Sequence, residues 1–518
     1  MRNQTGCAHC SRLLACATLV VALLVPFLLI STGMSQGSGT LVVAHHEGFA
    51  TLDVTSSTRR STLGIARVLL FDPLIMRGSD GSFQPGLATA WRQIDDLTLE
   101  LDLRQGVAFH DGTPFTAESV KFTIEKLLDP NQRTAQGFLW EGITEVQIID
   151  DFQVRIVTAR PFGPLMAHLT LGAMLPPNFD PEVNTTQPNG TGPFRFVSWS
   201  PGEELVVEAN PDFWGDAPGV ERVVFRPIIE DATRIAGVLS GDIHIAFGVP
   251  VQLVSVLNAT PDVDIARVPS PITQHISLGG DARPPVGGDP RVLQAIDLAI
   301  DREALIRDIF QGQAEMPSSI YSPNVFAAHP NLPAKVYDPD QARFLLAEAG
   351  YPDGFEAEIW YTAGGELQIA DAVVAITQQL ADVGIKLNIR VAADWGVGGP
   401  IINGRNFDMY YNGWATYTLD PDFYVWANFH PNARNREATD TYEFGPEVVS
   451  LVEKGRFSTD PQDRIDAYQR LQEILWENPT RLPVVQPFDL YAVHSDVQGF
   501  TPRSSQMWWD LRQATLGN

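Results

Sequence analysis

The chain has 518 residues, which is too long for one compact core and predicts two or three domains. Hydrophobic residues make up 44% of the chain and charged residues 19%, as in ordinary globular proteins. The formal net charge of −26 argues against a nucleic-acid-binding protein, because such a protein needs a basic surface to neutralise phosphates.

The N-terminus has the order of residues that is typical of a secretory signal. Arg2 and Arg12 are followed by an apolar run over residues 13–30 and then by small and polar residues over 31–37. We expect residues 1–36 to be a cleaved signal peptide, although the apolar run is also just long enough to remain as a membrane anchor. The protein is therefore expected in the periplasm or another extracytoplasmic compartment. All three cysteines lie in this segment, so the mature chain would have neither a disulfide nor a thiol nucleophile.

The first part of the mature chain is rich in predicted strands. Residues 41–44 predict a buried strand, and strict alternation over 97–104 predicts a strand with one solvated face. Thr116 is expected to cap a helix that ends at Asp129. Residues 192–208 predict a β-hairpin, because two β-rich runs flank a turn that contains Pro and Gly.

The clearest local prediction is a strand–helix–strand unit near the centre of the second half. Asp338 and Pro339 are typical of a helix start, and Gly350 of its end. A strand is then expected from residue 355, a helix over 369–383 and a strand over 385–391. This order predicts two parallel strands with a right-handed connection, so at least this half is α/β.

The sequence contains one incomplete metal-binding motif. His46 and Glu47 begin as in a zinc-binding HExxH motif, but Ala50 occupies the position of the second histidine. His45 and His46 follow a strand, so their side chains are expected on opposite faces and a shared metal is not favoured. We expect a loop that lines a cleft and no cofactor. A secreted metal-dependent hydrolase built on these residues remains the weaker alternative.

Large aromatic residues gather after strands in the C-terminal half. Trp395 follows the predicted strand 385–391, and Trp414 and Tyr417 follow a second apolar run. Ligands of open α/β sheets bind beyond the carboxyl ends of the strands, so these aromatics are candidate ligand contacts. Packing in the core is the alternative for each one.

Several segments resemble, in the same order, a family of extracellular solute-binding proteins known as family 5, which binds peptides, nickel chelates and opines. These segments are 90–117, 190–194, 210–214, 299–302, 337–339, 347–352 and the run from Gly413-Trp414 to Asp420-Pro421. Each is a weak signal alone, and their common order makes the resemblance specific over nearly the whole mature chain.

The resemblance implies an α/β, two-lobed periplasmic-binding-protein fold with an extra subdomain in the first lobe. The lobes are expected to close on a ligand about two hinge strands, near 275–278 and 484–486. The implied boundaries are 1–36 for the signal, 37–78 for the first segment of lobe I, 79–184 for the inserted subdomain, 185–277 for the second segment of lobe I, 278–485 for lobe II and 486–518 for the last segment of lobe I.

The resemblance also implies a function. Members capture a peptide or related small solute outside the cytoplasm and deliver it to the permease subunits of an ABC importer, without catalysis. We expect a monomer. A ligand-sensing partner of a membrane receptor would use the same cleft and remains a further alternative.

The expected site has one departure that bears on the solute. From the resemblance, His46, Glu47 and Phe49 are expected to reach the cleft from the first lobe. Trp395, Trp414, Tyr417 and Asp420 are expected there from the second lobe. Many peptide binders of the family carry an acidic residue at the position of Tyr417, where it holds the ammonium group of the ligand.

Without that acid, an ordinary dipeptide is a less favoured solute than a longer peptide, an opine-like compound, a sugar or a metal chelate. Residues 363–365 also supply no arginine for a ligand carboxylate. Asp420 either replaces the missing anchor or shapes a turn with Pro421.

Overall fold

The computed structural model describes residues 39–517 apart from 57–60, 79, 132–136, 280–283, 405–406, 432–444, 478–480 and 503–510. The chain divides into two units, Met1–Ser35 and Gln36–Asn518, and the described residues all belong to the second. The predicted signal and its apolar run therefore lie outside the described residues. Within the described part, no helix combines the length and apolar character needed to cross a membrane.

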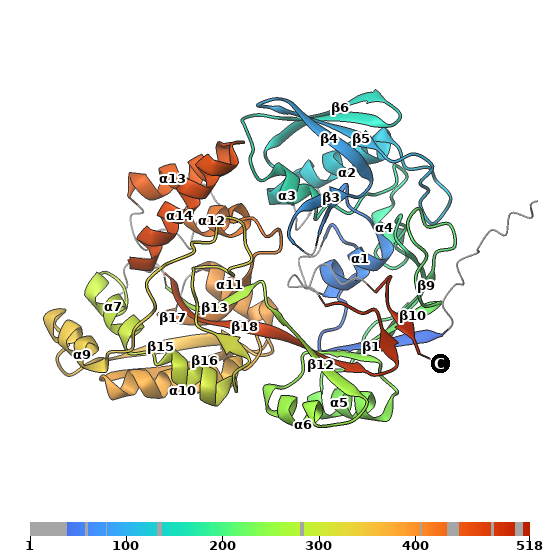
Figure 1. Ribbon diagram of the computed structural model, residues 1–518. Coiled ribbons are helices and arrows are strands. Elements are labelled where there is room, and N and C mark those ends of the chain that lie inside the picture. The colour runs from blue at the N-terminus through green and yellow to red at the C-terminus, as the bar shows by residue number, and fades with distance from the viewer. Residues whose placement is uncertain are drawn as a thin grey trace, which may run out of the picture. The chain divides into compact units, whose positions relative to one another are not determined.

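A 12-stranded mixed sheet runs through the described chain (Figure 1). Its strand order is β16-β15-β17-β13-β18-β11-β1-β10-β9-β8, and β12 and β14 also pair with β18. The strands are β1 (Thr40–His45), β8 (Phe194–Ser200), β9 (Glu204–Ala209), β10 (Arg222–Pro227), β11 (Ile245–Phe247), β12 (Val263–Pro269), β13 (Ile272–Leu278), β14 (Ala314–Glu315), β15 (Phe355–Thr362), β16 (Ile385–Ala392), β17 (Met409–Ala415) and β18 (Arg481–His494).

One end of this sheet is organised around β1, which is parallel to both β10 and β11. Leu41 and Val43 are fully buried on this strand, as predicted for residues 41–44. β8 and β9 pair in antiparallel register across the turn at residues 200–204, so the predicted hairpin is confirmed. The apolar side chains of these strands form the core of this end of the sheet.

The other end contains the predicted strand–helix–strand unit. α9 (Pro339–Glu348) begins after Asp338, whose carboxylate accepts a hydrogen bond from the backbone N–H of Gln341. β15, α10 (Ile369–Asp382) and β16 follow, and β15 is parallel to β16 along its whole length. Val373 and Ile376 of α10 are fully buried against the sheet, which confirms the predicted unit and its helical period.

The chain passes between the two ends of the sheet at two crossings. β18 pairs with β12 through residues 488–494 and with β13 through residues 481–485, and β12 runs directly into β13 (Figure 1). The crossings therefore lie at residues 270–271 and 486–487. We call residues 39–269 and 488–517 the first half, and residues 272–485 the second half.

The predicted hinge strands lie at unequal distances from these crossings. The predicted segment 484–486 borders the second crossing. The predicted segment 275–278 lies inside β13, where it pairs with β17, and so belongs to the second half. The resemblance gave only an approximate position, and the change of pairing partner fixes the crossing.

A separate antiparallel sheet of four strands is inserted in the first half, in the order β4-β5-β7-β6. Its strands are β4 (Ala88–Asp95), β5 (Thr98–Leu103), β6 (Ile143–Asp150) and β7 (Gln153–Thr158). α2 (Ala117–Leu128) packs on it through Val120 and Ile124. The backbone N–H of Thr116 donates to the Ser119 hydroxyl in a capping box, so the predicted helix start is confirmed. We call this region, which also contains α3 (Leu165–Leu169), the inserted subdomain.

Three helices form a compact cluster in the second half: α12 (Asp422–Phe429), α13 (Pro446–Phe457) and α14 (Pro461–Glu477). Tyr424, Val425, Tyr468 and Leu471 lie in its core. We call it the helical cluster.

The remaining elements are short helices and edge strands. The helices are α1 (Arg67–Leu70), α4 (Pro181–Asn184), α5 (Asp231–Ser240), α6 (Val254–Asn258), α7 (Pro290–Leu298), α8 (Arg302–Ala304) and α11 (Trp395–Gly404). Single turns of other helix types cover Ser61–Ala66, Gly137–Leu139, Val251–Leu253 and Leu305–Ile309. The strands β2 (Ile75–Arg77) and β3 (Phe83–Pro85) form one small pair, and β19 (Val497–Gln498) and β20 (Thr515–Leu516) form another.

Candidate functional site

A cavity of about 310 Å³ lies between the two halves, beside the crossings. Its first wall is formed by residues 45–47, at the C-terminal end of β1, and by residues 247–248, at the C-terminal end of β11. Its second wall is formed by Gln274 and residues 364–368, which follow β15. Both walls therefore include carboxyl ends of strands, where α/β sheets bind their ligands.

The first wall contains a stacked pair of histidines. The rings of His45 and His46 lie 4.4 Å apart at 21°, so the prediction that they point to opposite faces is wrong. The strand ends at His45 and the chain bends at His46, because the backbone N–H of Glu47 turns back to donate to His45 Nδ1 at 2.9 Å. His46 Nε2 lies 3.7 Å from Glu47 Oε1.

A metal-dependent enzyme would need more ligands than this pair provides. In the part of the chain that the structure describes, no group of three or more His, Cys, Asp or Glu side chains is placed to hold a metal ion. The alternative of a hydrolase built on His45, His46 and Glu47 therefore gains no ligand set from these residues.

Two features of the first half hold this wall in place. Gly248 has φ +69°, and a Cβ at this position would lie only 2.7 Å from His46 Nδ1. A glycine is therefore needed for the close approach. The buried guanidinium of Arg234 donates to the carbonyls of Ile228 and Gly248 and pairs with Asp231, so it ties α5 to the wall.

The second wall is held by a buried glutamine. Gln274 Nε2 donates to the carbonyl of Leu367 at 3.1 Å, and Gln274 Oε1 accepts a hydrogen bond from the Tyr411 hydroxyl at 2.9 Å. Glu366 lies against Gly413, where a Cβ would be 2.7 Å from the carboxyl carbon of Glu366. This wall was not predicted, although a Gly-Gly pair after a predicted parallel strand is a signal for it.

Among the predicted site residues, His46 and Glu47 line the cavity. Phe49 is only 8% exposed and packs edge-on against Phe225 in the core behind the first wall. Trp395 is 40% exposed at the start of α11 and is not among the residues that line the cavity.

The other three predicted residues lie together on the segment that leads from β17 into the helical cluster. The ring of Trp414 packs edge-on against Tyr424 at 5.8 Å, and Tyr417 packs against Phe423 at 6.0 Å. Tyr417 also borders the core of the inserted subdomain, so it lies where the two halves touch.

Asp420 is buried inside the second half and forms an ion pair there. It is 3% exposed and accepts hydrogen bonds from Arg464 Nη2 at 2.7 and 2.9 Å. It also accepts from the backbone N–H of Asp422, which is the turn geometry that the sequence offered as one of two interpretations. Burial raises the pKa of Asp420, but the charge and hydrogen bonds of Arg464 outweigh it and hold the pKa below its usual value.

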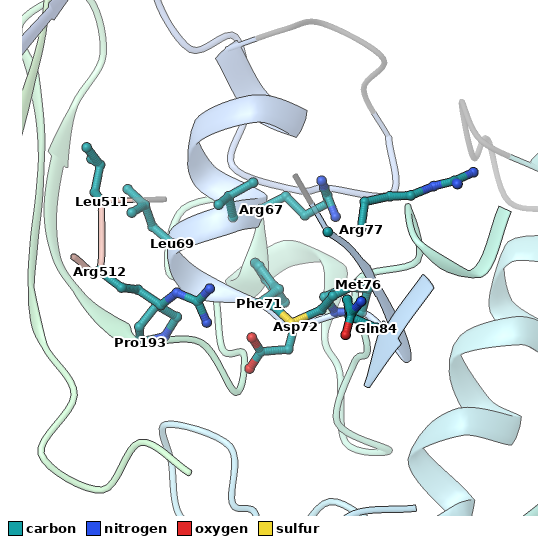
Figure 2. A pocket seen from close by; sticks show the side chains of 13 residues that line it. Arg67, Leu69, Phe71, Asp72, Met76, Arg77, Gln84, Pro193, Leu511 and Arg512 are labelled. Carbon is teal, nitrogen blue, oxygen red and sulfur yellow. The ribbon is translucent and has the colours of Figure 1, made fainter. Parts of the chain in front are cut away.

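A second cavity, of about 200 Å³, lies entirely in the first half (Figure 2). Arg67, Arg77 and Arg512 line it together with Asp72. Asp72 accepts hydrogen bonds from Thr191 and Trp214, at 2.9 and 2.8 Å, and burial raises its pKa to about 6. None of the predicted site residues lines this cavity, and because its lining comes from one half, closure of the halves would not enclose a ligand there.

Residues 82–436 match the family described as bacterial extracellular solute-binding proteins, family 5 middle. The glutathione-binding protein GsiB of Salmonella paratyphi A is 27% identical over 478 residues, which cover 89% of this chain and 91% of that protein.

Solved structures show the same fold. The periplasmic binding protein DppA of Helicobacter pylori, in complex with the peptide STSA, has a TM-score of 0.82 at 24% identity, covering 93% of this chain and 99% of that one. AgaA of A. tumefaciens R10, in complex with agropinic acid, has a TM-score of 0.80 at 24% identity, with coverage of 93% and 99%. The predicted two-lobed α/β fold is thereby confirmed. The chain belongs to the bacterial extracellular solute-binding proteins of family 5.

Proposed function

We propose that this protein captures a peptide or a related small solute in the cavity between its two halves and delivers it to the permease of an ABC importer. The observation that carries this proposal is the cavity itself, whose walls come from both halves beside the two crossings. A solute bound there contacts both halves at once, so its binding energy favours the closed arrangement. Recognition by the permease then requires no catalytic step, and the protein acts as a monomer outside the cytoplasm.

The character of the cavity favours a solute with a positively charged group. Glu47, Glu366 and Asp489 line it, and Arg234, the arginine among its lining residues, is already paired with Asp231. One of these carboxylates supplies the charge-assisted hydrogen bond to the positive group of the solute, which Tyr417 does not supply. A peptide held by its ammonium group at the cavity, rather than at residue 417, fits this arrangement.

The relatives indicate how wide the choice of solute is. GsiB is named for glutathione, DppA of H. pylori holds the peptide STSA and AgaA holds agropinic acid. An opine, a sugar or a metal chelate is therefore the second candidate class for this chain, supported by the absence of an acid at Tyr417.

The candidate residues take different roles in this proposal. His46 and Glu47 contact the solute from the first half, and residues 364–368 contact it from the second. A longer solute extends toward Trp414 and Tyr417, because Glu366 lies against the neighbouring Gly413. Phe49 supports the first wall from behind, Asp420 holds the helical cluster through Arg464, and Trp395 takes no part in the lining of the cavity.

The test is mass spectrometry of small molecules that are released when the purified unit Gln36–Asn518 is denatured. A co-purified peptide supports the leading proposal, and an opine, sugar or chelate supports the second class. If nothing is released, a thermal-shift screen follows, in which a ligand at 100 times its Kd adds about 2.7 kcal/mol of stability. A protein that binds no member of either class in both assays contradicts the proposal.

A further inference from the structure

The two halves also meet at a second place, away from the cavity and the crossings. There the inserted subdomain touches the helical cluster (Figure 1). The backbone N–H of Gly163 donates to the carbonyl of Arg456 at 2.9 Å, and His168 Nε2 lies 3.6 Å from Asp422 Oδ2. We call these four residues the closure contact.

The closure contact is buried and closely packed. His168 is 1% exposed, Asp422 2% and Arg456 4%. A Cβ at Gly163 would lie 2.2 Å from the carbonyl oxygen of Ser458 and 2.5 Å from Arg464 Nε, so not even a methyl group fits between the halves here.

This contact must break when the cleft opens. The chain joins the two halves only at residues 270–271 and 486–487, and Gly163 and His168 belong to one half while Asp422 and Arg456 belong to the other. A hinge motion about the crossings therefore separates the contact and exposes its polar groups to water.

The hydrogen on Nδ1 of His168 follows from its partner there. His168 Nδ1 lies 2.6 Å from the carbonyl oxygen of Leu139, which can only accept, so Nδ1 carries the hydrogen. His168 Nε2 faces Asp422, whose Oδ2 already accepts a hydrogen bond from Arg456 at 2.6 Å. The ring of Phe162 packs against the imidazole, with centroids 5.4 Å apart at 70°.

The charges around this imidazole already cancel. Asp422 is paired with Arg456 and Asp420 with Arg464, while burial raises the pKa of the Tyr468 hydroxyl so that it stays neutral. A proton on His168 would add an uncompensated charge to a buried site. Burial accordingly lowers the pKa of His168, and the attraction of Asp422 only partly offsets this.

We propose that the closure contact is a pH-responsive latch, in which the two halves close only over a neutral His168 and acidification opens the cleft. The inference rests on the proposed capture of a solute between two halves that move. Opening separates His168 from Asp422 and Arg456 and lets water reach it, so its pKa rises toward that of an ordinary histidine. The closed form therefore binds fewer protons than the open form.

The direction of the pH effect follows from this difference. The latch is at full strength above about pH 6.5 and weakens as the pH falls below that value, toward the lowered pKa of the closed form. Because one proton is exchanged, the ratio of closed to open molecules falls by up to about tenfold for each pH unit.

The test measures the distance between the halves directly and needs no ligand. The unit Gln36–Asn518 contains no cysteine, so Glu125→Cys on α2 and Glu447→Cys on α13 place spin labels at exposed sites of the two regions. Pulsed electron spin resonance at pH 7.5 and 5.5 is expected to show a shift to longer distances in acid. His168→Gln cannot titrate and is expected to abolish the shift. The control His329→Gln removes a histidine that pairs with Glu473 within the second half, and is expected to retain it.

Gly163→Ala provides an independent test should His168→Gln fail to fold. Its methyl group has no room in the closed form and meets no obstacle in the open form, so it is expected to give the long distance at both pH values. A wild-type distance that does not depend on pH, a full shift in His168→Gln, or a closed Gly163→Ala variant would each overturn the latch. A pH-dependent distance in a protein that binds no solute would instead overturn the proposed function and leave the latch standing.

Discussion

Two of the places where the halves meet, the cavity and the closure contact, are built in opposite ways. The cavity beside the crossings has room for a small molecule, and its walls carry histidine, glutamate and glutamine side chains. The closure contact has no room for a methyl group, and its charges are paired before any ligand arrives. In the function proposed here one surface selects the solute and the other stabilises closure, so the two properties can change independently.

The largest effect is expected where the helical cluster holds its buried charge. Asp420→Asn leaves the guanidinium of Arg464 without its carboxylate, which is expected to lower the free energy of unfolding by about 3–5 kcal/mol. Urea denaturation at pH 7.5 measures this loss. The control Glu447→Gln breaks an exposed pair with Arg470 and is expected to cost under about 1 kcal/mol.

Asp420→Asn also discriminates between the two interpretations of this aspartate. A variant that unfolds like the wild type but no longer binds solute would show that Asp420 anchors the ligand. That outcome would move the solute site from the cavity to the helical cluster.

At the cavity we expect the opposite result, a loss of affinity for the solute without a loss of stability. Glu47→Gln removes a carboxylate from the first wall and is expected to weaken binding of the co-purified solute by about 1.5–3 kcal/mol, or roughly 10- to 150-fold, with unchanged stability. Titration calorimetry with that solute measures the change. Glu204→Gln, on the first half outside the cavity, is the matched control. Equal affinity of Glu47→Gln and the control would exclude the first wall as a solute contact.

Much of the local structure could be predicted from the sequence, because it depends on residues that are close along the chain. The start of α9 at Asp338 needs only the side chain of that residue and the N–H of Gln341. The parallel pair β15 and β16 follows from the helical period of apolar residues over 369–383 and the alternation of apolar residues over 385–391, with Gly384 between the two segments.

The site itself depends on partners that are distant along the chain. His46 lies against Gly248, Asp420 pairs with Arg464, and His168 meets Asp422 across the two halves. No local pattern encodes these meetings. The prediction that His45 and His46 point to opposite faces was wrong for a different reason, since the turn in which the Glu47 N–H donates to His45 Nδ1 ends the strand period at His45.

A second titrating group, Asp72, sharpens the pH comparison, because the effect of its titration has the opposite sign to that of His168. Asp72 lies inside the first half with a pKa raised to about 6, so it stabilises the fold when protonated and loses that contribution as the pH rises through 6. Between pH 5 and 7.5 the free energy of unfolding is expected to fall by about 1.4 kcal/mol more in the wild type than in Asp72→Asn. Acid therefore stabilises this half while it opens the closure contact. Thermal unfolding at the two pH values measures the difference, and parallel pH profiles of the two proteins would contradict it.

The smallest effect tests whether the second wall keeps a strained residue for binding. Gln368 precedes α10 at φ 57°, a left-handed conformation that costs a residue with a Cβ about 1 kcal/mol, yet its side chain lines the cavity. Gln368→Gly is expected to raise the free energy of unfolding by about 1 kcal/mol and to weaken solute binding. Gln311 has the same kind of backbone, at φ 49°, and does not line the cavity, so Gln311→Gly is expected to stabilise without any loss of binding. If both variants bind as the wild type does, the strain at Gln368 belongs to the helix start and not to the solute site.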